Sequence, residues 1–129
     1  MNAKGCEFLI LICGKSSNDM ELTNATLALH KLTQDPTNRL LIVSLGAVEV
    51  LTSLCATSPF TNVLFYASQA LYALLTDEEA KAPDSIHEEA LRAVSRALIF
   101  LIGAEDGHLI AKAHVSATVK VIRGLCSRS

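Results

Sequence analysis

The chain has 129 residues, of which 50% are hydrophobic and 19% charged, and this composition excludes a disordered, collagenous or low-complexity protein. Eleven basic residues against thirteen acidic ones give a formal charge of −2, so there is no broad positive field to hold a nucleic acid. Only 5% of the residues are aromatic and tryptophan is absent, which leaves little material for base-stacking platforms.

The first quarter of the chain predicts two helices. Residues 7–13 are almost entirely apolar and are interpreted as a buried helix, because the run is too short to span a bilayer or to serve as a typical signal peptide. Asn18, followed three residues later by Glu21, is typical of a capping box that opens a second helix ending near residue 33. No membrane insertion is expected.

Proline and glycine mark the next three elements. Pro36 after an aspartate suits the first position of a short helix over residues 36–43, and Gly46 permits a sharp turn into a helix over residues 47–56. A Ser-Pro pair ends that helix, and a longer helix follows over residues 61–75.

The last third of the chain predicts two further helices. Ser85 and Glu88 have capping-box spacing and open a helix over residues 86–102, while an Asp-Gly turn precedes a final helix over residues 108–125. No segment alternates between polar and apolar residues with period two, so the predicted fold class is all-α.

The sequence contains an internal repeat. Placing residue 5 on residue 47 aligns residues 5–35 with residues 47–77 without a gap, and ten of the aligned pairs are identical. We call this alignment the repeat register. Most of the identical pairs are apolar and follow helical spacing, so the repeated unit is expected to be helical. The ten pairs are Glu7/Glu49, Leu9/Leu51, Cys13/Cys55, Ser16/Ser58, Leu22/Leu64, Ala25/Ala67, Ala28/Ala70, Leu29/Leu71, Leu32/Leu74 and Asp35/Asp77.

Two runs of residues in this region follow a regular pattern. The first has the spacing N-x3-I-x3-G-A-[IV]-x2-L-x2-L and comprises Asn38, Ile42, Gly46, Ala47, Val48, Leu51 and Leu54. The second has the spacing A-x2-A-L-x2-L and comprises Ala67, Ala70, Leu71 and Leu74. Together they resemble the armadillo repeat, in which the second run is the core of the third helix. The resemblance implies a short right-handed α-solenoid of armadillo or HEAT-like repeats, forming a single domain over residues 1–129. Within it, residues 5–35 are a partial repeat, 36–77 a complete one, and 83–125 a degenerate repeat or HEAT-like hairpin.

The same resemblance implies a groove lined by successive third helices, along which family members bind extended peptides. The positions that correspond to it are Thr23, Leu27, Lys31, Phe65, Gln69, Ala73, Arg92, Arg96 and Phe100. The Trp and Asn ladder with which nuclear-import receptors hold basic peptides is absent from these positions. The expected ligand is therefore a peptide or helix with apolar anchors for the two phenylalanines and acidic groups for the two arginines. The alternative is that both phenylalanines belong to the core.

No catalytic, metal or cofactor residues are expected. None of the four histidines lies in a recognised motif, and a zinc site of His108, His114 and Cys126 has the wrong spacing for ligands on one helical face. The four cysteines form no Cys-x-x-Cys pair and are interpreted as buried free thiols, which favours a reducing, cytoplasmic location.

The function expected from these features is that of a non-catalytic scaffold module that binds a protein or peptide partner. The alternative is a structural module that self-associates through its apolar first helix, as a homodimer or as a fragment of a longer solenoid.

Overall fold

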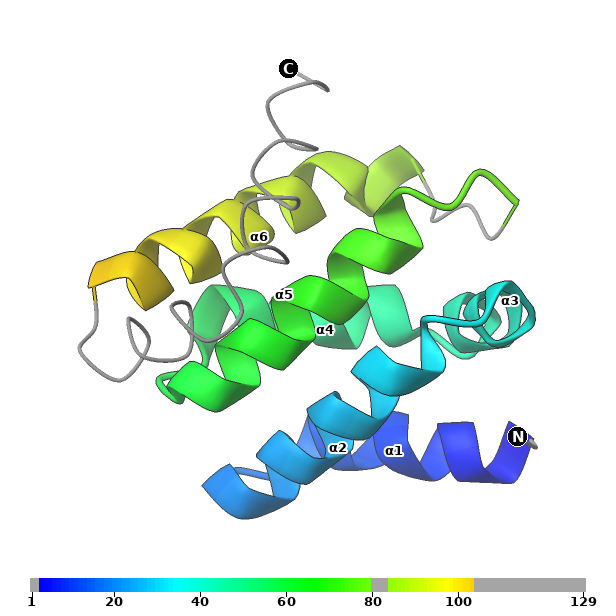
Figure 1. Ribbon diagram of the computed structural model, residues 1–129, viewed down its shortest axis with the longest axis horizontal. Helices are drawn as coiled ribbons and strands as arrows, with labels where there is room; N and C mark the ends of the chain where they lie inside the picture. The colour runs from blue at the N-terminus through cyan, green and yellow to red at the C-terminus, as the bar shows by residue number, and fades with distance from the viewer. Residues whose placement is uncertain (1–2, 80–83, 104–129) are drawn as a thin grey trace.

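The computed structural model describes residues 3–79 and 84–103, and all regular structure within them is α-helical (Figure 1). The all-α prediction is confirmed for this part of the chain, while the helix predicted over residues 108–125 lies outside it. In chain order the helices are α1 (Ala3–Lys15), α2 (Asp19–Leu32), α3 (Pro36–Ser44), α4 (Ala47–Thr57), α5 (Thr61–Leu75) and α6 (Asp84–Gly103).

Three predicted helix starts have the local structure that their sequences indicate. The side chain of Asn18 accepts a hydrogen bond from the Glu21 backbone N–H at 3.0 Å and caps α2. Asp35 accepts one from the Thr37 N–H at 2.9 Å and caps α3. Gly46 precedes α4 with φ of 88°, in the left-handed region that favours glycine.

The capping boxes themselves differ from the prediction. Glu21 does not return a hydrogen bond to Asn18, because its Oε1 accepts one from the Ser16 hydroxyl at 2.7 Å. The Asn18 N–H donates instead to the Ser16 oxygen at 3.1 Å, so the serine stands between the two expected partners. Ser85 does not cap α6 either, since Asp84 already belongs to the helix and its carboxylate suits the positive first turn.

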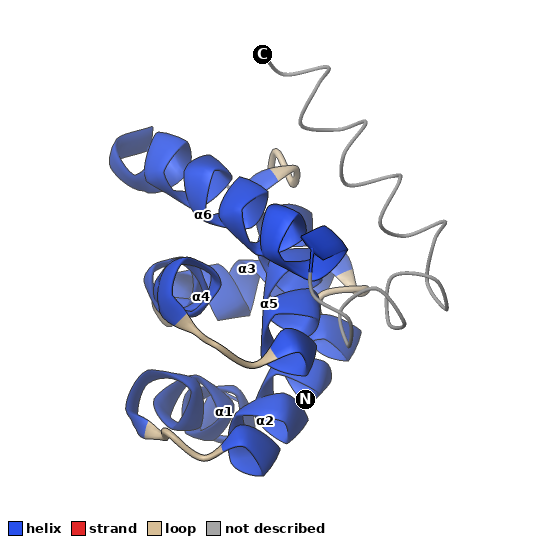
Figure 2. Cartoon of the chain, turned by 90° about the vertical axis from the view of Figure 1, so that its left-hand side faces the viewer, coloured by secondary structure: helices blue, strands red, loops and turns tan. Residues whose placement is uncertain are grey.

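The helices pack in successive layers (Figure 2). α1 packs on α2 and α4 packs on α5, while α2 lies against α5 and α1 against α4. α6 lies across both α4 and α5, on the side away from α1 and α2. α5 is therefore the central helix, with α2, α4 and α6 all packed around it.

Burial follows both the repeat and the position in the stack. Four of the ten identical pairs are buried in both copies, namely Cys13/Cys55, Leu22/Leu64, Ala25/Ala67 and Leu29/Leu71. In four others only the member in or next to α4 and α5 is fully buried, namely Leu9/Leu51, Ser16/Ser58, Ala28/Ala70 and Leu32/Leu74. The difference arises because α1 and α2 are packed on fewer sides than α4 and α5.

Five hydrogen bonds recur in the repeat register. Two are backbone bonds at helix ends. The Ser16 N–H donates to the Ile12 carbonyl, as the Ser58 N–H does to the Leu54 carbonyl; the Leu22 N–H donates to the Asn18 carbonyl, as the Leu64 N–H does to the Phe60 carbonyl. Three involve side chains. The Asn18 N–H donates to Ser16 Oγ, as the Phe60 N–H does to Ser58 Oγ. The Thr26 hydroxyl donates to the Thr23 carbonyl, as the Ser68 hydroxyl does to the Phe65 carbonyl, and the Thr37 N–H donates to Asp35 Oδ1, as the Glu79 N–H does to Asp77 Oδ1. The two stretches therefore share turn and capping geometry as well as residues.

One half-buried arginine ties three of these segments together. The guanidinium of Arg39 in α3 donates through Nε to the carboxylate of Asp77, beyond the end of α5, and through Nη1 to the Thr33 carbonyl at 2.7 Å, just after α2. Through the ion pair with Asp77 and the hydrogen bond to Thr33, α3 links the end of α5 to the end of α2.

Candidate functional site

The three candidate residues in α2 lie on or beside its outward face. Lys31 is exposed, Leu27 is half-buried, and the half-buried Thr23 donates its hydroxyl hydrogen to Asp19 Oδ1 at 3.0 Å. The side chain of Lys31 has no hydrogen bond or ion pair with any described residue, so its ammonium group is available to a ligand.

The candidates in α5 are less accessible. Phe65 is buried and meets the ring of Tyr66 edge-on, with 5.4 Å between ring centroids. Gln69 is only 8% exposed, and its Nε2 has no hydrogen-bond partner among the described residues. A buried amide donor left unpaired costs about 1–3 kcal/mol. Ala73 is half-buried and adds a short apolar surface.

The candidates in α6 make contacts within the protein. Arg92 is exposed and pairs with Glu88 one helical turn earlier, at 2.6 Å. The Nη1 atom of Arg96 donates to the carbonyls of Cys55 at 3.0 Å and Ser58 at 3.2 Å, where α4 ends. Its guanidinium also lies 5.3 Å from the ring centroid of Phe100.

These contacts bring Arg96 and Phe100 together over the end of α4. A cation is favoured at that position because unpaired carbonyls give a helix C-terminus partial negative charge.

Sequence analysis missed four residues of the outward faces. In an α-helix each residue advances by about 100°, so a straight stripe follows the spacing i, i+4, i+7, i+11. The stripe that includes Leu27 and Lys31 begins at Met20 and Asn24, and the equivalent stripe in α5 runs from Asn62 through Tyr66 to Gln69 and Ala73. We call these two lines the α2 stripe (Met20, Asn24, Leu27, Lys31) and the α5 stripe (Asn62, Tyr66, Gln69, Ala73).

The two stripes are related residue by residue through the repeat register, because α2 and α5 are equivalent helices that lie side by side. An aromatic contact joins the helices, because the ring of His30 in the last turn of α2 stacks on that of Tyr66 in α5, with 6.1 Å between centroids and 28° between planes. The two stripes therefore lie on neighbouring helices, and all of their side chains except that of Gln69 are exposed or half-buried.

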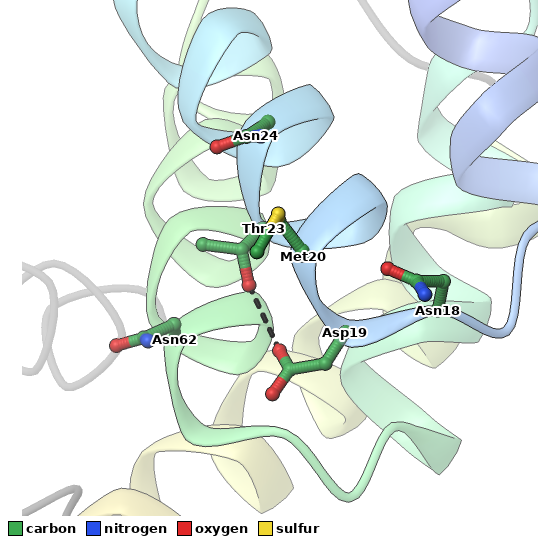
Figure 3. A pocket seen from close by; sticks show the side chains of 6 residues that line it. All are labelled: Asn18, Asp19, Met20, Thr23, Asn24 and Asn62. Atoms are coloured by element: carbon green, nitrogen blue, oxygen red, sulfur yellow. Dashed lines mark hydrogen bonds between the residues drawn. The ribbon is translucent and has the colours of Figure 1, made fainter.

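A hollow of about 500 Å³ opens at the start of the two stripes, where the first turns of α2 and α5 approach each other (Figure 3). Asp19 is the one charged side chain among the described residues that line it, and one of its oxygens accepts the bond from Thr23. The remaining lining consists of amide and thioether groups: Asn18, Met20, Asn24 and Asn62. The hollow thus presents mainly hydrogen-bond acceptors and donors with one negative charge.

The histidines, acidic residues and cysteines of the described part of the chain were considered as metal ligands and as nucleophiles. No group of three or more His, Cys, Asp or Glu side chains in residues 3–79 and 84–103 is arranged to hold a metal ion. Cys6, Cys13 and Cys55 are buried free thiols, and desolvation raises the pKa of Cys13 and of Cys55 to about 12, so neither is a nucleophile near neutral pH. The zinc ligands considered from the sequence, with His108 the first of them, lie outside the described residues.

One further test concerns membranes. In the described part of the chain no single helix is long and apolar enough to cross a bilayer, and α3 and α4 reach that length only together, across an 84° bend.

Comparisons with protein-family models, with curated proteins and with solved structures gave no match to this chain.

Proposed function

We propose that the chain is a short right-handed α-solenoid of armadillo or HEAT-like type, and that it serves as a non-catalytic module that binds a peptide or helix of a partner protein. The solenoid arrangement is supported by the five hydrogen bonds that recur in the repeat register and by the packing of α1 and α2 against α4 and α5. A reducing, cytoplasmic location is part of the proposal and agrees with three buried free thiols.

The observation that supports binding most directly is the pairing of the two stripes. Equivalent helices present side chains from equivalent positions at a regular spacing, which is how a stack of repeats forms an extended surface for a linear ligand. Leu27 and Tyr66 on the stripes, with His30 stacked on Tyr66, supply apolar and aromatic area of the kind found at the centres of interfaces. Lys31 supplies a free positive charge at one end.

A display library of random peptides tests this proposal. Binders are selected on the folded chain and then measured on the variants Asn24→Arg and Asn62→Arg, which place a long charged side chain on each stripe. Both asparagines are exposed, so the fold should tolerate the changes. Ser53→Arg, at an exposed position of α4, adds the same side chain away from the stripes and is the matched control.

The proposal predicts that each stripe variant weakens the selected peptides at least about tenfold, equivalent to about 1.4 kcal/mol, while the control leaves affinity unchanged. Peptides that bind all three variants alike would contradict it.

A second candidate function, self-association through α1, is supported by two exposed apolar side chains. Phe8 is 62% exposed and Leu11 is 50% exposed, one turn apart on the outer face of that helix. Together they offer apolar area on the order of 200 Å², against about 800 Å² per partner in a stable interface. Self-association through this patch alone should therefore be weak. Light scattering of the wild-type chain and of Phe8→Glu at rising concentration measures it, and identical masses throughout would exclude it.

A further inference from the structure

We propose that the surface formed by the α2 and α5 stripes recognises an extended peptide segment of mixed charge, with a basic side chain in the hollow beside Asp19 and an acidic side chain at Lys31. This inference rests on the proposed function and adds the chemistry of the partner. It differs from the sequence-based expectation of a ligand with apolar anchors and only acidic charged groups, whose charge depended on two arginines of α6.

The first step concerns which cations are available. Of the three basic residues expected in the groove, Arg96 is bonded to the backbone at the end of α4 and Arg92 is paired with Glu88. Lys31 has neither kind of partner among the described residues, so it is the cation that can meet a carboxylate of the ligand without breaking an internal contact.

The second step concerns the opposite end of α2. The carboxylate of Asp19 lines the hollow, is exposed, and has one oxygen bonded to Thr23 while the other has no partner in the described part of the chain. Asn24 and Asn62 line the same hollow with amide groups, each of which contains one acceptor oxygen. A carboxylate with a free oxygen is the acceptor that pairs best with the N–H donors of a guanidinium group.

The third step is the spacing. Asp19 and Lys31 are twelve residues apart in α2, which places them about 18 Å apart along the helix axis and about 120° apart around it, so Asp19 lies beside the α2 stripe. An extended peptide advances about 3.3–3.6 Å per residue, so the basic and acidic residues of the ligand should be separated by at least about five positions. An apolar side chain between them would lie over Leu27 and Tyr66.

Three synthetic peptides with a fluorescent label test the inference by anisotropy. Each has eight residues with a leucine near the middle and two charged residues five positions apart: one arginine with one glutamate, two arginines, or two glutamates. Binding is measured to the wild-type chain and to Asp19→Asn and Lys31→Met. Glu21→Gln, also in the first turn of α2 but outside the hollow, and Lys15→Met in α1 are the matched controls.

The mixed peptide should bind most tightly. Asp19→Asn should weaken the mixed and two-arginine peptides about 1.4- to 5-fold and spare the two-glutamate peptide, because one exposed charge pair is worth about 0.2–1 kcal/mol. Lys31→Met should weaken the mixed and two-glutamate peptides to a similar degree, and the controls should change nothing.

Other outcomes overturn the inference in distinguishable ways. If the peptides bind, and the stripe variant Asn24→Arg weakens them, but Asp19→Asn and Lys31→Met act no differently from their controls, the surface binds peptides without reading charge. The proposed function then stands and the inference fails. Failure of all three peptides to bind at millimolar concentration refutes the inference, and the display selection decides separately whether the proposed function survives.

Discussion

Replacing Arg39 by methionine should destabilise the protein by about 2 kcal/mol, somewhat less than the loss of one partner from a fully buried ion pair, which costs about 3–5 kcal/mol. The change retains most of the apolar stem but removes two charge-assisted hydrogen bonds, one to Asp77 and one to the Thr33 carbonyl. The side chains of Arg39 and Asp77 are only 21% and 10% exposed, so solvent screens their attraction weakly. We expect a smaller loss of stability than for a fully buried pair, because both side chains keep some exposure and Asp77 still accepts a hydrogen bond from the Glu79 N–H.

Urea unfolding of Arg39→Met, Asp77→Asn and the double variant measures the coupling between the two side chains. With a slope of about 1–3 kcal/mol per molar urea, the single arginine variant should shift the midpoint by about 1 M. The cycle should give a coupling energy of about 1–2 kcal/mol.

The exposed pair between Arg92 and Glu88 is the internal control for this prediction. Its side chains are 73% and 80% exposed, so Arg92→Met should cost no more than about 0.3 kcal/mol. Equal losses for Arg39→Met and Arg92→Met, or a coupling energy near zero between Arg39 and Asp77, would refute the reasoning that α3 fixes the ends of α2 and α5.

Three further predictions concern the backbone and the buried thiols. Gly46→Ala should destabilise by about 1 kcal/mol in thermal or urea unfolding, because a Cβ at φ of 88° is strained although nothing closer than 3.8 Å obstructs it. Gly14→Ala should instead stabilise by about 0.4–1 kcal/mol, since the new methyl group would meet Val50 at an ordinary 3.8 Å within a helix; a stabilising Gly46→Ala or a destabilising Gly14→Ala would contradict the prediction for that variant. Stability should fall as pH rises from about 9 toward 12, because unfolded thiols ionise near pH 9 while the pKa of Cys13 and of Cys55 in the folded protein is about 12. In that interval each thiol lowers the free energy of unfolding by about 1.4 kcal/mol per pH unit. Cys13→Ala should therefore make the free energy of unfolding depend less steeply on pH, and an unchanged slope would refute the raised pKa of Cys13.

Much of the fold could be predicted from local rules. The starts of α2, α3 and α4 follow from Asn18, Asp35 and Gly46, whose side chains or backbone freedom act within a few residues of the chain. The capping box predicted at the start of α2 is not formed in full, because the Ser16 hydroxyl bonds both the Glu21 carboxylate and the Asn18 N–H, which would otherwise bond each other. A spacing rule for two residues does not account for that third group.

The binding surface was harder to predict because it depends on helix rotation and crossing. The positions predicted from the sequence are four residues apart, so each one is rotated by about 40° around the helix relative to the one before it. As a result the predicted line in α5 begins at Phe65, which is buried, whereas the neighbouring Tyr66 is half-buried and belongs to the α5 stripe. Arg96 contacts the end of α4 because α6 lies across α4 and α5 together. Periodicity predicts which residues share a helix face, but packing between distant helices decides what that face contacts.

The most direct test of the central claim is an amide NMR titration of the isotope-labelled chain with a peptide obtained by display selection. The claim that partners bind across α2 and α5 predicts that shift changes concentrate at Asn24, Leu27, Asn62 and Tyr66 and are small in α1 and α4. Changes centred on Phe8 and its neighbours in α1, or spread evenly over the chain, would contradict the claim.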